Sequence, residues 1–119
     1  MISRVHTHRY AGDMELHARP DADGSWLVTL HGELDLAAVP GFRSATQEAL
    51  RDGWTDLIVD LQHVEFIDSA GIGVLIGLRR RTVEAGGSLT LRASEQVSSV
   101  LSMSNVDALF NVDPVGSEA

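Results

Sequence analysis

Cysteine and lysine are both absent from this chain of 119 residues, and each absence excludes a class of chemistry. Without cysteine there is no thiol catalysis, no disulfide and no cysteine-bound zinc. Because all nine basic side chains are arginines, a Walker-type phosphate loop, a Schiff-base enzyme and a Ser–Lys hydrolase are excluded as well. Aromatic residues make up only 5% of the chain, so the core must consist mainly of Leu, Val, Ile and Ala.

Long apolar runs are also missing. No run reaches the roughly eighteen residues of a membrane span, and the N-terminal residues lack the apolar stretch of a signal peptide. Together with the lack of cysteine, this leads us to expect a cytoplasmic protein without membrane insertion. The formal net charge of −8 disfavours nucleic acid and anionic membrane as partners, because both repel an acidic protein. The acidity suits a basic or neutral partner, or serves only to keep the protein in solution.

The length suits one domain, and apolar spacing and turn formers divide it into alternating elements. Strands are expected at 14–18, 26–31, 56–61, 88–91 and 109–112. Helices are expected to begin near 39, 69 and 94, and loops are expected at 32–35 and 62–68.

After an opening hairpin, strands and helices alternate. That order predicts an α/β domain with a mixed, mostly parallel sheet of four to five strands and helices packed mainly on one face. We expect this domain to span residues 13–113, between a flexible N-terminal arm at 1–12 and a C-terminal tail at 114–119.

The segment around Ser69 carries the most chemical information, because a strand leads there into a loop and the loop into a helix. The first amides of a helix lack internal acceptors and carry partial positive charge, so they bind anions. A phosphate on Ser69 could therefore be held by these amides. Gly71 and Gly73 would keep the first turn open for the backbone of a partner. The plainer alternatives are that Ser69 and Asp68 only cap the helix, and that the glycines serve packing.

The motifs at 32–35 (Gly-Glu-Leu-Asp) and 66–75 (Phe-Ile-Asp-Ser-Ala-Gly-Ile-Gly-Val-Leu) resemble those of the anti-sigma factor antagonists, which consist of a STAS domain. The resemblance extends from about residue 14 to residue 112, in the same order of elements. One difference is Ala70, where some members carry a second hydroxyl residue. That difference leaves Ser69 as the sole acceptor in the motif.

This resemblance implies a protein that is not an enzyme and needs no cofactor of its own. Its unphosphorylated form would bind an anti-sigma factor that is also a serine kinase, and would thereby release a sigma factor. Phosphorylation of Ser69 would break the complex, and a serine phosphatase would restore it. Asp35 is implied to lie near the phosphoacceptor. The expected partner-binding residues are Leu34, Asp35, Asp68, Ser69, Ala70, Gly71, Ile72, Gly73 and Ile76.

The sequence also leaves room for other functions. A STAS scaffold or an accessory subunit of a sensory complex or transporter, without phosphorylation, is the main alternative. A Ser–His–Asp hydrolase using Ser69 with His63 or His31 is disfavoured, because the nucleophile-elbow pattern requires glycine where Ile67 stands. His6 and His8 could chelate a metal, but no further ligand lies near them in the sequence, so we expect no metal site.

Overall fold

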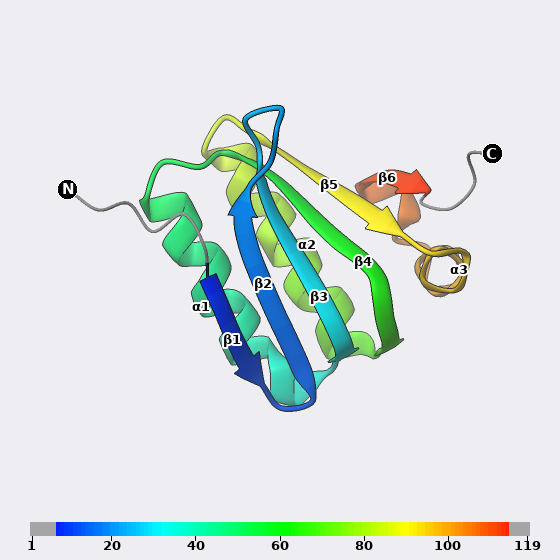
Figure 1. Ribbon diagram of the computed structural model, residues 1–119. Coiled ribbons are helices and arrows are strands. Elements are labelled where there is room, and N and C mark those ends of the chain that lie inside the picture. Colours follow the sequence, from blue (N-terminus) through cyan, green and yellow to red (C-terminus); the bar gives the residue numbers. More distant parts are fainter. Residues whose placement is uncertain (1–6, 115–119) are drawn as a thin grey trace.

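The computed structural model describes residues 7–114, which form one six-stranded sheet with three α-helices (Figure 1). The strands follow one another across the sheet in chain order. The first three are antiparallel neighbours, and the last three each pair in parallel with the strand before. Their bounds are β1 Thr7–Ala11, β2 Met14–Pro20, β3 Trp26–Leu34, β4 Asp56–Ile67, β5 Ser88–Ala93 and β6 Asn111–Pro114.

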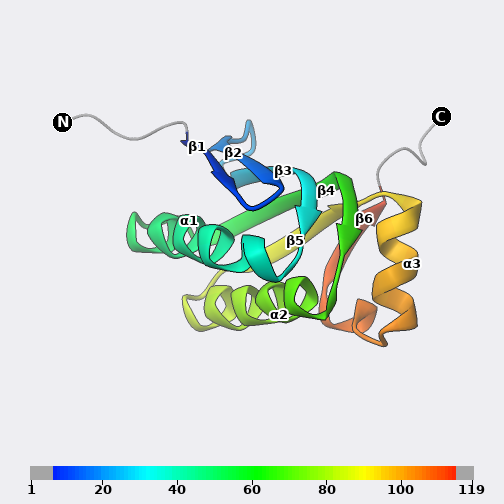
Figure 2. The same cartoon turned by 90° about the horizontal axis from the view of Figure 1, so that it is seen from below.

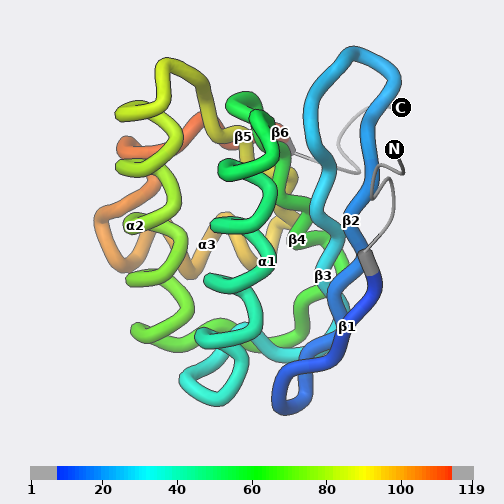
Figure 3. Tube along the Cα trace, turned by 90° about the vertical axis from the view of Figure 1, so that its left-hand side faces the viewer, coloured from blue at the N-terminus to red at the C-terminus, as the bar shows by residue number. Residues whose placement is uncertain are grey.

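Helices connect the parallel strands, as crossovers between parallel neighbours require. They are α1 Val39–Arg51, α2 Ser69–Glu84 and α3 Glu95–Met103, with short 3-10 turns η1 Leu36–Ala38 and η2 Asp107–Leu109. Helices α1 and α2 lie side by side against one face of the sheet, and α3 stands at its β6 end (Figures 2 and 3). The predicted α/β class, with a mixed sheet and helices mainly on one face, is confirmed.

The core lies between the sheet and the helices. Its largest fully buried side chains include Phe42 of α1, Leu75 and Leu78 of α2, and Leu30 of β3. In β2, residues 14, 16 and 18 are buried and alternate with more exposed ones, as expected of a strand covered on one face. The opposite face of β1–β3 has no helix over it (Figure 3). Within residues 7–114, no helix is both long and apolar enough to span a bilayer.

The expected N-terminal arm at 1–12 is wrong for residues 7–11, which form edge strand β1 and pair with β2 from Thr7↔Ala18 to Ala11↔Met14. Mixed polar residues hide this strand in the sequence, because an edge strand with one open face carries little apolar signal. The sheet therefore has six strands instead of four or five. The last strand also lies two residues later than expected, at Asn111–Pro114. Residues 1–6 and 115–119 lie outside the described part of the chain.

The loops expected at 32–35 and 62–68 are wrong as well, because β3 and β4 continue to Leu34 and Ile67. Two register shifts in their pairing, after Thr29 and after Gly32, place extra residues in β4. Each bulge adds one residue, so the inward side chains Leu61, Val64 and Ile67 are spaced by three and not by two. Such spacing does not look like a strand in a sequence.

The first bulge has its own local support. Buried Asp60 accepts hydrogen bonds from the backbone N–H of Gln62 at 3.0 Å and from its side-chain amide at 2.9 Å. These bonds satisfy a carboxylate that would otherwise be buried without partners.

Candidate functional site

The two sequence motifs meet where parallel strands β3 and β4 end together. Leu34 pairs with Ile67 in the last register position of the two strands. The residues that follow, Asp35 and Asp68, therefore leave the sheet side by side, since the carboxyl ends of parallel strands lie at one edge. Strand pairing thus joins positions that are more than thirty residues apart in the chain.

Asp68 ties this junction together. Its Oδ1 accepts a hydrogen bond from the Gly71 backbone N–H at 2.9 Å, and its Oδ2 accepts one from the Leu36 N–H at 3.3 Å. The first bond makes Asp68 the N-cap of α2, and the second fixes the turn that follows β3. Asp35 caps that turn by accepting from the Ala38 N–H at 3.2 Å. The interpretation of Ser69 as the N-cap is wrong, because Asp68 holds that position.

Ser69 is the first residue of α2, and it is exposed. Its hydroxyl makes no hydrogen bond to any residue that the structure describes. With Asp68 as the cap, the Gly71 amide is already occupied, and the Ile72 N–H donates to the Asp68 carbonyl at 3.0 Å. The expectation that all first-turn amides could hold a phosphate is therefore wrong for Gly71 and Ile72. The earlier amides of the turn, at Ser69 and Ala70, are the ones left for that role.

The two glycines of the motif differ sharply. Gly71 is buried, and a Cβ at this position would collide with the backbone carbonyl oxygen of Leu34. Gly73 is exposed, and a Cβ there would meet no atom within 4 Å. Gly71 therefore serves the close packing of α2 on the end of β3, which was the plainer alternative, whereas Gly73 leaves open space on the outer side.

The site is acidic. Partial desolvation raises the pKa of Glu33 above its usual range, and repulsion from Asp13, Asp35 and Glu65 raises it further. The carboxylates at this edge of the sheet therefore already repel one another. A negative charge on Ser69, which directly follows Asp68, would add to the acidity of these strand ends.

The expected partner-binding residues separate into three groups. Leu34 is fully buried and Gly71 is packed against its backbone, so neither presents a side chain to a partner. Asp35 and Asp68 are half-buried and cap η1 and α2. The third group lies on the face of α2 away from the buried Val74 and Leu78, with Ala70 at its edge. It consists of Ser69, Ala70, Ile72, Gly73 and Ile76, of which Ser69 and Gly73 are exposed and the others half-buried.

Sequence reasoning missed two exposed apolar side chains, one from each end of the paired strands. Leu36 in η1 is 70% exposed, and Phe66 near the end of β4 is 52% exposed. Leu36 is held beside the start of α2 by its hydrogen bond to Asp68. The signal was present in the sequence, because Leu36 directly follows the first motif and Phe66 opens the second.

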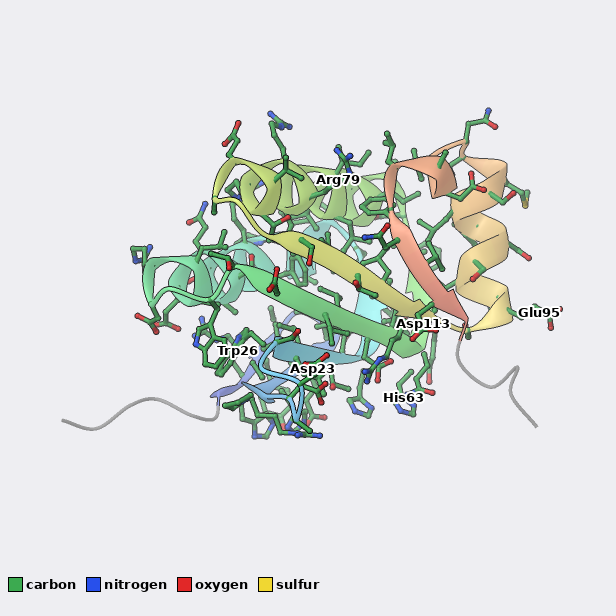
Figure 4. All side chains as sticks on the ribbon, turned by 90° about the horizontal axis from the view of Figure 1, so that it is seen from above. Asp23, Trp26, His63, Arg79, Glu95 and Asp113 are labelled. Atoms are coloured by element: carbon green, nitrogen blue, oxygen red, sulfur yellow. The ribbon has the colours of Figure 1, made fainter. Side chains whose placement is uncertain are left out.

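The histidines of the disfavoured Ser–His–Asp hydrolase lie on strands β3 and β4 and not at the start of α2. His31 and His63 stack on each other across β3 and β4, with ring centroids 4.7 Å apart. Figure 4 shows His63 pointing away from helix α2, whose first residue is Ser69. Within the described residues, no hydrogen bond joins Ser69 to either imidazole. The arrangement offers no base for a serine nucleophile.

Residues 14–119 match the STAS domain family. The chain is 31% identical over 101 residues to a STAS-domain containing protein of Pseudomonas aeruginosa, covering 83% of this chain and 99% of that protein. It is 26% identical over 92 residues to an anti-sigma-B factor antagonist of Staphylococcus aureus, covering 76% and 85% of the two chains.

Among solved structures, the anti-sigma factor antagonist SpoIIAA in its unphosphorylated form superposes with a TM-score of 0.62. The two chains are 26% identical, and the match covers 74% of this chain and 82% of that one. The phosphorylated form of SpoIIAA from Bacillus gives a TM-score of 0.65 at 22% identity, over 84% and 92% of the two chains, a likeness of fold alone.

The sheet topology and the paired ends of β3 and β4 define a single α/β domain with its candidate site at the start of α2. The chain belongs to the STAS domain family.

Proposed function

We propose that this protein is a cytoplasmic anti-sigma factor antagonist whose binding to its partner is controlled by phosphorylation of Ser69. In its unphosphorylated form it binds an anti-sigma factor that is also a serine kinase, and this releases a sigma factor. Phosphorylation of Ser69 abolishes the binding, and a serine phosphatase reverses the modification. The names of the Staphylococcus relative and of the SpoIIAA structures support this role, since both are anti-sigma factor antagonists. The protein acts by binding and not by catalysis.

The observation that carries the proposal is the exposed Ser69 hydroxyl at the first residue of α2. Asp68 already caps the helix, so the hydroxyl is not needed to close it. A kinase can therefore reach Ser69 without unwinding α2, and modification leaves the cap intact.

The contact surface that we propose is small and partly apolar. It consists of Ser69, Ile72, Gly73 and Ile76 on α2, with the exposed Leu36 beside the start of the helix and the exposed Phe66 near the end of β4. Exposed apolar side chains grouped on one part of a surface are typical of binding sites. The open space at Gly73 admits a partner backbone that a larger side chain would exclude. The adjoining carboxylates of Asp35 and Asp68 orient a basic partner.

Phosphorylation acts on this surface through charge. A phosphate adds nearly two negative charges, and Glu33 and Asp35 stand close to the same strand ends. At the centre of an interface, the dianion would lose its water without gaining a cation. A penalty of about 3–4 kcal/mol weakens binding several-hundred-fold, which is enough for a switch.

The first test is modification. The protein is incubated with the serine kinase of its own organism and Mg-ATP, and the sites are mapped by mass spectrometry. We expect phosphate at Ser69 and none in the Ser69→Ala variant. A kinase that modifies another substrate but leaves Ser69 untouched would contradict the switch and favour a STAS scaffold or accessory subunit.

The second test is binding of the same kinase, measured by calorimetry on the unphosphorylated protein. Ser69→Asp should weaken binding at least about tenfold, because one added charge is a partial substitute for phosphate. Ser69→Ala should bind like the wild type. Ser99→Asp is the matched control, since Ser99 is an exposed serine on α3 and adds the same charge elsewhere. Equal affinity of Ser69→Asp and wild type would refute the charge mechanism.

A further inference from the structure

A row of imidazole rings crosses the open face of the sheet, away from the Ser69 site. It runs from β1 to β4 through His8, His17, His31 and His63. Neighbouring ring centroids lie 4.1, 5.8 and 4.7 Å apart, and the first and last pairs are stacked. Four imidazoles in succession on adjacent strands are more than strand pairing needs.

The β1 end of the row contains a carboxylate. His8 and His17 are directly opposite each other in the antiparallel pairing of β1 and β2. Glu15 precedes His17 by two residues, so its side chain lies on the same face of β2. The Nε2 atoms of both histidines lie 2.8 Å from one oxygen of Glu15, its Oε2. Two imidazoles and a carboxylate therefore converge on one point.

This convergence matches the donor set of a transition metal. One donor atom from each of the three residues lies within 4.8 Å of the others. Zinc binds imidazole nitrogen at about 2.0–2.1 Å and carboxylate oxygen at about 2.0–2.2 Å, so three donors a few ångströms apart can share one ion. We propose that His8, Glu15 and His17 form a binding site for a divalent transition-metal ion of the Zn²⁺ class, with water completing a tetrahedral shell.

Sequence reasoning set a metal aside because no further ligand lay near His8 in the chain. The strand register supplies what the sequence could not show, since His17 and Glu15 reach His8 only through the β1–β2 pairing.

Binding changes the hydrogen bonds of the cluster. Each imidazole that binds through Nε2 must give up the N–H at that atom, and its remaining proton then lies on Nδ1. The ion replaces the two hydrogen bonds to Glu15 Oε2 by coordination bonds to the same three residues. Since β1 is an edge strand joined to the sheet only through β2, the ion would fasten this edge.

The site is tested with ZnCl₂ and the full-length, tag-free protein, by calorimetry and by the rise in the unfolding temperature. We expect one ion per chain with a dissociation constant below about 100 μM. Glu15→Gln and His17→Gln should each weaken binding at least about tenfold, because each removes one of three protein ligands.

A histidine variant serves as the matched control. His63→Gln removes an exposed imidazole of the same face that lies outside the cluster. It should bind Zn²⁺ like the wild type. No binding below about 1 mM would overturn the site and leave the cluster as a hydrogen-bonded staple of β1. Binding that His17→Gln leaves unchanged would overturn it too. Neither result touches the Ser69 switch, which uses none of these residues.

Discussion

The end of strand β3 and the open face of β1 and β2 each contain a glutamate with a displaced pKa, and the displacements are opposite. At the strand ends beside Ser69, partial burial and acidic neighbours raise the pKa of Glu33. On the open face, hydrogen bonds from His17 and His8 lower the pKa of Glu15. The first environment opposes further negative charge, and the second favours a cation. The proposed phosphoserine switch and the proposed metal site are consistent with these two environments.

The two regions also differ in how the chain builds them. At α2, the key residues are contiguous: cap, acceptor and glycines all fall within Asp68–Gly73. On the open face, the ligands come from two strands and meet only through register. Substitutions at α2 should therefore act on local helix packing, whereas substitutions on the open face should act on strand pairing and charge.

The largest expected effect comes from Gly71→Ala. A Cβ at this position collides with the Leu34 carbonyl oxygen, which is backbone and cannot rotate away. Separating α2 from the end of β3 by enough to fit a methyl group should lower the free energy of unfolding by about 2–3 kcal/mol. Urea denaturation followed by circular dichroism measures the change.

Gly73→Ala is the control for that substitution, because its Cβ would face open space on the same turn. Alanine is the better helix former, so this variant should be more stable than the wild type by up to about 1 kcal/mol. A similar loss of stability in both variants would show that the Leu34 contact is not what requires glycine at position 71.

A smaller loss is expected from Asp68→Ala. The substitution removes the acceptor for the Gly71 and Leu36 N–H groups and so uncaps α2 and frees the turn after β3. We expect a loss of about 1–2 kcal/mol in the free energy of unfolding. Asp68→Asn should retain most of the stability, since asparagine caps a helix about as well as aspartate. If Asp68→Asn lost as much as Asp68→Ala, the charge and not the capping bond would be the stabilising feature.

The fold class was predictable because its signals are periodic. Alternating apolar residues in β2 and helical spacing in α1 and α2 give their types directly. The elements that were predicted wrongly depend on neighbouring strands. β1 is a strand because β2 lies beside it, and the end of β4 is a strand despite two bulges. A bulge changes the spacing of inward residues, so periodicity alone cannot recover it.

The site was predictable in part for the same reason. Ser69 and Asp68 follow from a contiguous motif, and their place at the start of α2 was correctly predicted. The roles of Leu34 and Gly71 were not, because both depend on how far β3 extends before it turns. The cluster of His8, Glu15 and His17 has no sequence signature at all, since its members are assembled by register.

The smallest effects should come from the two glutamates themselves, and their signs should be opposite. A lowered pKa means that ionised Glu15 stabilises the fold above its unfolded pKa, and that this contribution is lost as the pH falls through the folded value. Glu15→Gln should therefore be less stable than the wild type near pH 7, and the difference should shrink in acid.

Glu33 behaves in the reverse way. Because its folded pKa is raised, ionisation opposes folding, and the penalty grows as the pH rises through the interval between the unfolded and folded values. Glu33→Gln should be more stable than the wild type near pH 7 and equal to it at low pH, where both forms are neutral. Urea denaturation of both variants across this pH range gives the comparison. Parallel pH profiles for the two variants would show that the acidic strand ends and the histidine cluster do not differ in the way their pKa shifts indicate.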